Sequence, residues 1–212
     1  MKYRLVGCIV TLGGLLSVVT AQASELELVR QAMEAGRWIE ARARLERLLR
    51  ERPDWYAARR MRVEVYLHLG LLAEAEAEVT ALRAQGESDP EWWRLMGDVQ
   101  AAGGRWDGAY EAYQRGRELS PRDRTLLLRL GGAALWIQAF EPARQAFEAV
   151  LRERPQDPEA HYGLARLEAL LGKPELALRH LEVCFAQGWI QPEAIRRDPV
   201  FVEVTRLPGF PR

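Results

Sequence analysis

Residues 90–123 read PEWWRLMGDVQAAGGRWDGAYEAYQRGRELSPRD, and this stretch decides the fold. Apolar residues recur every three or four positions up to Gly103 and again from Trp106 onward, which predicts two helices joined by a tight turn. The spacing of the stretch, 34 residues, continues in both directions along the chain. With Pro90 as position 1, five repeats without insertions begin at the following residues: Gln22, Tyr56, Pro90, Arg124 and Pro158.

Three positions of the 34-residue repeat carry its packing pattern. Position 20 is alanine in all five repeats, as expected where two helices approach closely: Ala41, Ala75, Ala109, Ala143 and Ala177. Position 24 lies one turn further along the same face and predicts a buried seam: Leu45, Val79, Tyr113, Phe147 and Leu181. Position 15 is glycine in four repeats and Gln138 in the remaining one, at the point where the first helix must end and the chain must reverse.

Seven residues of the stretch carry a family resemblance, at positions 4, 7, 8, 15, 20, 24 and 32: Trp93, Met96, Gly97, Gly104, Ala109, Tyr113 and Pro121. The pattern resembles the tetratricopeptide (TPR) repeat, a helix-turn-helix unit of the same length. Over residues 24–191 the resemblance implies an all-α fold, a right-handed superhelical solenoid of five such units.

The second repeat departs from the family pattern, because Arg59 and Arg62 occupy positions 4 and 7. One interpretation is that its first helix sits rotated, with the arginine stems lying over its flanks. An apolar stripe is still present in this helix: Trp55, Ala58, Met61, Val65 and Leu69.

The first 23 residues differ in kind from the rest of the chain. Lys2 and Arg4 form a basic head, residues 5–19 form an apolar run without charge, and residues 21–23 form a small-residue site. This pattern predicts a signal peptide, with cleavage after Ala23 and export to the periplasm or the medium. A retained anchor is disfavoured because the run is shorter than the ~20 residues that a spanning helix needs. Lipidation of Cys8 is disfavoured because the apolar run follows Cys8 instead of preceding it.

Residues 192–212 follow the last repeat and contain a set of apolar side chains: Ile195, Phe201, Val202 and Phe210. The last helix of a repeat stack leaves its apolar seam open, and these side chains are suited to cover it. The sequence therefore predicts a C-terminal helical cap.

Composition argues against several classes of function. Without Lys2 and Arg4 the chain has 28 basic and 30 acidic residues, a balance that lacks the positive charge of a nucleic-acid-binding protein. No serine is paired with a histidine in a recognisable hydrolase spacing, so we expect a protein that is not an enzyme and uses no cofactor. His161, His180 and Cys184 could approach one another as zinc or copper ligands. Core filling is the favoured interpretation, because no fourth ligand follows from the spacing.

The resemblance also implies a binding groove. In the TPR family the concave face is lined by one stripe of each first helix, here positions 2, 5, 9, 12 and 13. From this stripe we expect the following residues to contact a partner: Arg60, Arg94, Leu128, Leu135, Trp136, Tyr162 and Arg166. Trp136 is the expected centre, since aromatic residues often dominate interface energies. The alternative is that Trp136 packs against the first helix of the fifth repeat, near Tyr162.

These features predict a periplasmic TPR scaffold of the bacterial cell envelope that binds a peptide or helix of another protein in its groove, without membrane insertion after signal cleavage. A clamp for the acidic C-termini of chaperones is disfavoured, because the family builds it from lysine and asparagine. This chain has no asparagine, and its lysines are Lys2 and Lys173. The alternative function is a structural subunit that associates with copies of itself.

Overall fold

The computed structural model describes residues 25–211, and every regular element within them is a helix. The predicted signal peptide over residues 1–23, its cleavage site after Ala23, and Cys8 lie outside the described residues. The chain forms two compact parts that divide after Leu82. They are called here the N-terminal part (25–82) and the C-terminal part (83–211). Within residues 25–211 no helix combines the length and the apolarity needed to cross a membrane.

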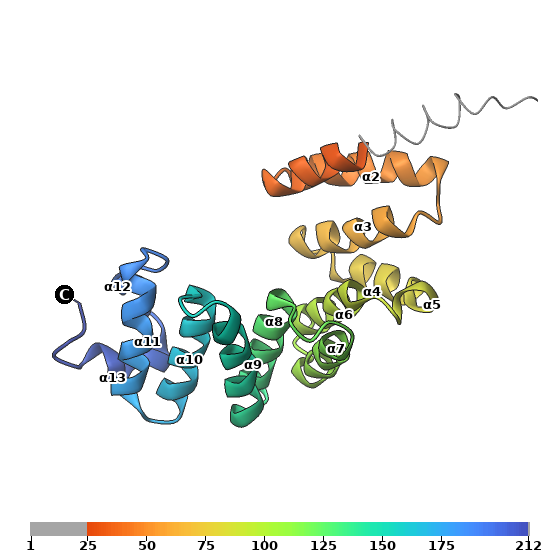
Figure 1. Ribbon diagram of the computed structural model, residues 1–212. Helices are drawn as coiled ribbons and strands as arrows, with labels where there is room; N and C mark the ends of the chain where they lie inside the picture. The colour runs from red at the N-terminus through yellow and green to blue at the C-terminus, as the bar shows by residue number, and fades with distance from the viewer. Residues whose placement is uncertain (1–24, 212) are drawn as a thin grey trace, which may run out of the picture. The chain divides into compact units, whose positions relative to one another are not determined.

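The N-terminal part begins with a helix over residues 25–34. It continues with α2 (Trp38–Glu51), α3 (Tyr56–His68) and α4 (Leu72–Ala81) (Figure 1). Its core forms where Leu45 and Leu49 of α2 pack with Ala58 and Val65 of α3. Trp55, Met61 and Leu69 pack against this core, so the apolar stripe expected in the second repeat is confirmed.

The two arginines that depart from the family pattern face α4. Arg59 donates from Nε to Glu78 at 2.6 Å, and Arg62 donates from a terminal nitrogen to the other carboxylate oxygen, also at 2.6 Å. Glu78 is only 8% exposed, so this charge lies inside the helix pair and is neutralised there. An ion-pair cluster therefore stands where the family pattern expects apolar side chains.

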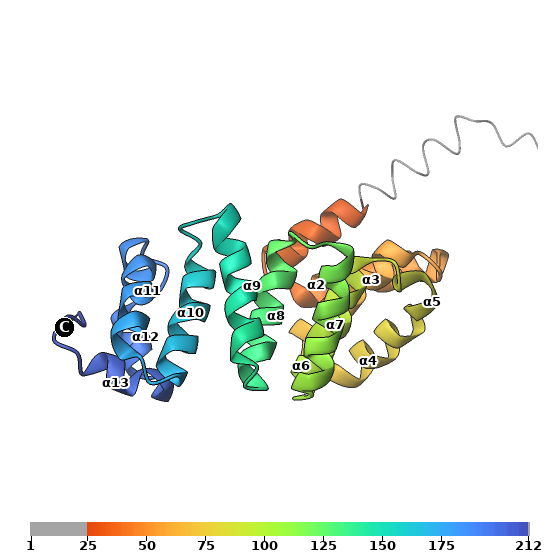
Figure 2. The ribbon, with the colours of Figure 1, turned by 60° about the horizontal axis from the view of Figure 1, so that its bottom comes forward.

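The C-terminal part consists of a short helix, three helix pairs and a tail. The helices are α5 (Arg83–Gly86), α6 (Pro90–Ala102), α7 (Trp106–Leu119), α8 (Arg124–Trp136), α9 (Phe140–Glu153), α10 (Pro158–Leu170), α11 (Pro174–Ala186), α12 (Pro192–Arg196), η1 (Pro199–Phe201) and α13 (Val202–Thr205). Figures 1 and 2 show α8 to α11 following one another, with α12 and α13 beside α11.

The first helix of each pair in this part starts from an aspartate cap. The carboxylates of Asp89, Asp123 and Asp157 accept hydrogen bonds of 2.9–3.1 Å from backbone N–H groups of the first turn. These N–H groups have no partner within the helix, so each cap satisfies a donor that would otherwise be lost. The caps recur every 34 residues and fix where α6, α8 and α10 begin.

The packing positions of the repeat are buried as predicted. All five alanines at position 20 are 0% exposed, and the five apolar side chains at position 24 are 0–3% exposed. Position 15 has positive φ in every repeat, including Gln138 at 58°. Glycine adopts this left-handed conformation freely, whereas a residue with a side chain is strained in it. The reversal is thus imposed by the packing of the helix pair even where glycine is missing.

Side-chain size is matched within each helix pair between positions 8 and 24. A methyl group at Gly97 would lie 2.3 Å from the Tyr113 ring, and one at Gly131 would lie 2.6 Å from the Phe147 ring. Where position 24 is smaller, position 8 is larger: Val29 with Leu45, Val63 with Val79, and Ala165 with Leu181. The two positions therefore share the space of the seam, and a large aromatic ring at position 24 is paired with glycine at position 8.

The tail packs on the last helix pair. Ile195, Phe201, Val204 and Phe210 are 0–7% exposed and form one cluster with Leu178 and Leu181 of α11. Val202 is 48% exposed, so the expectation that it helps to cover the seam is wrong. In the short helical turn that carries them, Phe201 and Val204 lie three residues apart and point inward, which leaves Val202 outside.

Candidate functional site

A groove of about 1040 Å³ lies in the C-terminal part, between corresponding faces of α8 and α10. The two first helices share positions 2, 5, 6, 9 and 13 of the repeat in this lining, on one face of each helix: Thr125, Leu128, Arg129, Gly132 and Trp136 from α8, and Glu159, Tyr162, Gly163, Arg166 and Leu170 from α10. Helix α8 also contributes Arg124 and Leu135. Phe140 and Phe147 of α9 lie behind them, and Trp189 and Val200 border the groove from the C-terminal side. The lining is charged toward the starts of α8 and α10 and apolar toward their ends.

Trp136 is the most exposed large apolar side chain of the groove, at 62%. Its ring stacks on Trp106 of α7, with centroids 4.8 Å apart and planes 8° from parallel. The stack fixes the orientation of the indole, so a contact with Trp136 costs little side-chain entropy. The N-terminal part repeats the arrangement at the corresponding positions 17 and 13, where Trp38 stacks on His68 at 3.8 Å.

Arg166 and Tyr162 of the groove contact residues of the tail. Arg166 donates to Asp198 at 2.7 Å and lies 3.4 Å from the Tyr162 hydroxyl. The Tyr162 ring lies 5.5 Å from Trp189 and 5.8 Å from Phe201. The positions of these two groove residues therefore depend on the packed tail.

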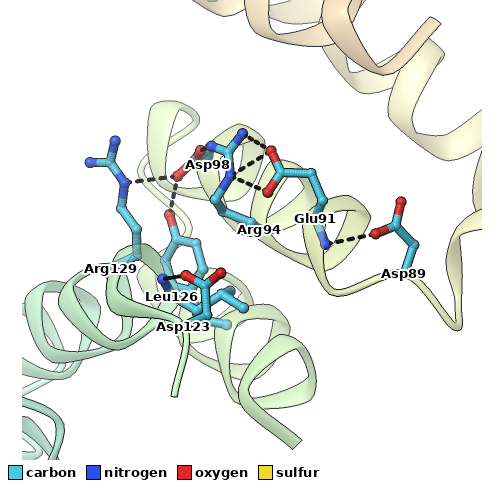
Figure 3. A network of polar contacts seen from close by, with 8 residues as sticks. Asp89, Glu91, Arg94, Asp98, Asp123, Leu126 and Arg129 are labelled. Atoms are coloured by element: carbon cyan, nitrogen blue, oxygen red, sulfur yellow. Dashed lines mark hydrogen bonds and ion pairs between the residues drawn. The ribbon is translucent and has the colours of Figure 1, made fainter. Parts of the chain in front are cut away.

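Arg129 is held by a polar network that joins α6, α7 and α8 (Figure 3). Asp98 accepts from Arg94 at 2.5 Å and from the Tyr113 hydroxyl at 2.7 Å, and it pairs with Nε of Arg129 at 3.4 Å. Burial, followed by the neighbouring Asp98 carboxylate, raises the pKa of Tyr113 far above its usual range, so its hydroxyl remains a donor. The network orients Arg129 while its side chain stays 56% exposed.

The structure brings together five of the seven residues expected to contact a partner: Leu128, Leu135, Trp136, Tyr162 and Arg166. Arg94 does not line the groove. It is 9% exposed, and its guanidinium group is bound by Glu91 and Asp98, so its contact with a partner stays a prediction. Arg60 lies in the N-terminal part, with its guanidinium group 5.5 Å from the Tyr56 ring.

Two features of the groove were missed by the sequence analysis. The alternative for Trp136 placed it against α10, yet its ring partner is Trp106 on α7. Arg129 was not expected at all, because position 6 was assigned to neither face. The structure shows that position 6 lines the groove in both first helices, as Arg129 in α8 and Gly163 in α10.

The His161, His180 and Cys184 set is arranged for packing. The two imidazoles share a contact of 2.9 Å between their Nδ1 atoms, and the Cys184 thiol donates to the Pro158 carbonyl at 3.3 Å. Burial raises the pKa of this thiol to about 11 and so disfavours the thiolate that a metal would need. Within residues 25–211, no group of three or more His, Cys, Asp or Glu side chains could hold a metal ion.

Stacked helix pairs with an open groove between successive first helices define the class: a helical-repeat protein. The sequence model of the tetratricopeptide repeat matches residues 32–99 and 100–167, which is more than half of the chain. The chain belongs to the tetratricopeptide repeat family, whose members bind other proteins and are typically not enzymes. No curated protein sequence matches the chain.

Several solved structures are similar in fold. TTC0263, a thermophilic TPR protein of Thermus thermophilus, has a TM-score of 0.72 at 20% identity, over 88% of this chain and 100% of that one. PilW, described as a widely conserved type IV pilus biogenesis factor, has 0.76 at 17% identity, over 88% and 85%. PilF of Pseudomonas aeruginosa has 0.73 at 18% identity, over 88% and 84%. At these identities the likeness concerns the fold.

Proposed function

We propose that this chain is an exported interaction scaffold of the bacterial cell envelope, and that it binds a peptide or helix of another protein in the groove between α8 and α10. The observation that carries the proposal is Trp136, an aromatic side chain 62% exposed within a large open groove and held in place by its stack on Trp106. Exposed apolar surface of this kind commonly marks an interaction site. The likeness in fold to PilW, a pilus biogenesis factor, supports a role in envelope assembly.

Substitution of Trp136 by alanine tests the groove. We expect capture of envelope proteins from a native periplasmic extract to fall about tenfold or more, because a central aromatic anchor contributes roughly 2 kcal/mol or more. The loss of the Trp106 stack should lower the free energy of unfolding by only about 1 kcal/mol. Capture is measured by crosslinking and pull-down, and stability by chemical denaturation.

The matched control is Leu119→Ala, because Leu119 is 46% exposed and lies outside the groove. This variant should capture as the wild type does. Capture that persists in Trp136→Ala, or that disappears only together with the folded state, would count against the groove. Ordered oligomers in light scattering, without any captured protein, would favour the self-associating subunit instead.

Export is supported by the residue pattern at the N-terminus, with its basic head, apolar run and small-residue site ending at Ala23. We expect the mature protein to begin at Ser24 and to be found in the periplasmic or extracellular fraction. N-terminal sequencing of the protein purified from its native host checks this. A chain that still begins at Met1, or that carries a lipid on Cys8, would contradict it.

A further inference from the structure

We propose that the occupant of the groove is a segment of a partner protein that presents a bulky apolar side chain and, about one helical turn away, a carboxylate. The apolar side chain fills a hollow above Gly132, and the carboxylate binds Arg129. This inference rests on the proposed function and adds to it the chemical identity of the bound segment.

The hollow exists because Gly132 has no side chain on the groove face of α8. A methyl group built at Gly132 would meet nothing within 4 Å, whereas one at the neighbouring Gly131 would collide with the Phe147 ring. Gly131 is thus explained by helix packing, and Gly132 is not. Leu128 and Trp136 lie one turn to either side of it on the same helix face, so the hollow has apolar walls.

The hollow is specific to the fourth repeat. The position that Gly132 occupies is filled by Asp98 in the preceding repeat and by Arg166 in the following one. Both of those side chains are engaged in ion pairs within the protein. Among the three first helices of this part, only α8 therefore leaves room at this repeat position for a large apolar side chain of an occupant.

Three arginines and one acid, Glu159, line the groove, and two of the arginines are neutralised by acids of the protein. Arg124 binds both Asp157 and Glu159, and Arg166 binds Asp198. Arg129 is different, because the nitrogen nearest to Asp98 is Nε, at 3.4 Å. Figure 3 shows the two terminal nitrogens of Arg129 pointing away from Asp98. This end of the guanidinium group can donate two parallel hydrogen bonds to a carboxylate.

The two features are close enough to act on one segment. Arg129 and Gly132 are three residues apart on α8, so they are neighbours on its surface, with Cβ positions about 5–6 Å apart. A segment that places an apolar side chain above Gly132 can therefore place an acidic side chain, or its own C-terminal carboxylate, beside Arg129. A wholly apolar occupant would make no hydrogen bond to the two terminal nitrogens of Arg129.

The test uses a phage-displayed library of random dodecapeptides, selected on the full mature chain. We expect the selected peptides to combine a large apolar residue with an acidic residue or a C-terminal carboxylate within about one turn. Their affinities are then measured by fluorescence polarisation. Gly132→Leu should weaken binding about tenfold or more by filling the hollow, while the fold remains at least as stable because glycine is poor in helix interiors.

Arg129→Gln should weaken binding of the acidic peptides about tenfold and leave their Asn or Gln counterparts almost unchanged. The matched controls are Ala186→Leu and Arg122→Gln, exposed changes outside the groove that should have no effect. Selected peptides without acidic groups, or affinities that ignore both groove substitutions, would overturn the inference. If the selected peptides lack acidic groups but lose affinity in Trp136→Ala, the proposed function holds and only this inference fails. If no selected peptide loses affinity in Trp136→Ala, the proposed function and this inference both fail.

Discussion

Replacing Arg144 by methionine is expected to lower the free energy of unfolding by about 3 kcal/mol. Arg144 of α9 donates to one carboxylate oxygen of Glu168 on α10, at 2.6 Å. Glu168 is only 2% exposed, and among the described residues its second oxygen has no hydrogen-bond partner. The substitution would leave a buried carboxylate without its cation, which costs far more than the loss of a surface ion pair. Chemical denaturation of the purified protein measures the change.

The double variant Arg144→Met with Glu168→Met separates the ion pair from the packing around it. Because it removes both charges and keeps most of the apolar volume, we expect it to regain most of the stability lost in the single variant. A single variant as stable as the wild type would show that the Glu168 carboxylate is tolerated without Arg144. It would also mean that the ion pair between Arg144 and Glu168 does not stabilise the packing of α9 on α10.

Ending the chain at Gln191 is expected to destabilise the last helix pair by several kcal/mol and to cause aggregation. The tail buries four apolar side chains, and each contributes roughly 1.5–3 kcal/mol when fully removed from water. Leu178 and Leu181 of α11 would be exposed in the truncated chain. Thermal unfolding and light scattering check the result. An equally stable and monomeric truncation would show that the tail is not a cap.

A pair of adjacent substitutions gives the same test without shortening the chain. Phe201 is 0% exposed and Val202 is 48% exposed. Phe201→Ala should cost about 3–5 kcal/mol by leaving a cavity, whereas Val202→Ala should change the free energy of unfolding by less than about 0.5 kcal/mol. Similar effects of the two substitutions would contradict the packing of the tail on α11.

The sequence predicted the register of the helices well, because a strict 34-residue period can be recognised from the residue types alone. The alanines at position 20 and the apolar residues at position 24 are buried in every repeat. Arg59 and Arg62 could not be interpreted in the same way, since their apparent mismatch is resolved by Glu78, a buried acid on the next helix. The residue pattern of one helix does not show which charged side chain of a neighbouring helix will face it.

The groove was predicted in part for the same reason. Trp136 and Tyr162 follow from the repeat position alone, and both line the groove. The stack of Trp136 on Trp106 and the orientation of Arg129 by Asp98 depend on side-chain geometry between helices. Arg94 was expected at the groove because it occupies position 5 of its repeat, but Glu91 and Asp98 on α6 bind its guanidinium group.

The space around the Phe147 ring limits how these repeats can be recombined. Phe147 fits only because Gly131 of its own repeat and Gly163 of the next one both lack a side chain; a methyl group at Gly163 would lie 2.4 Å from its ring. A fourth repeat transplanted without the fifth would carry a phenyl ring with no room on one side. The fourth and fifth repeats therefore have to be exchanged together. A gene duplication that copies the fourth repeat alone would require a compensating substitution in the neighbouring repeat.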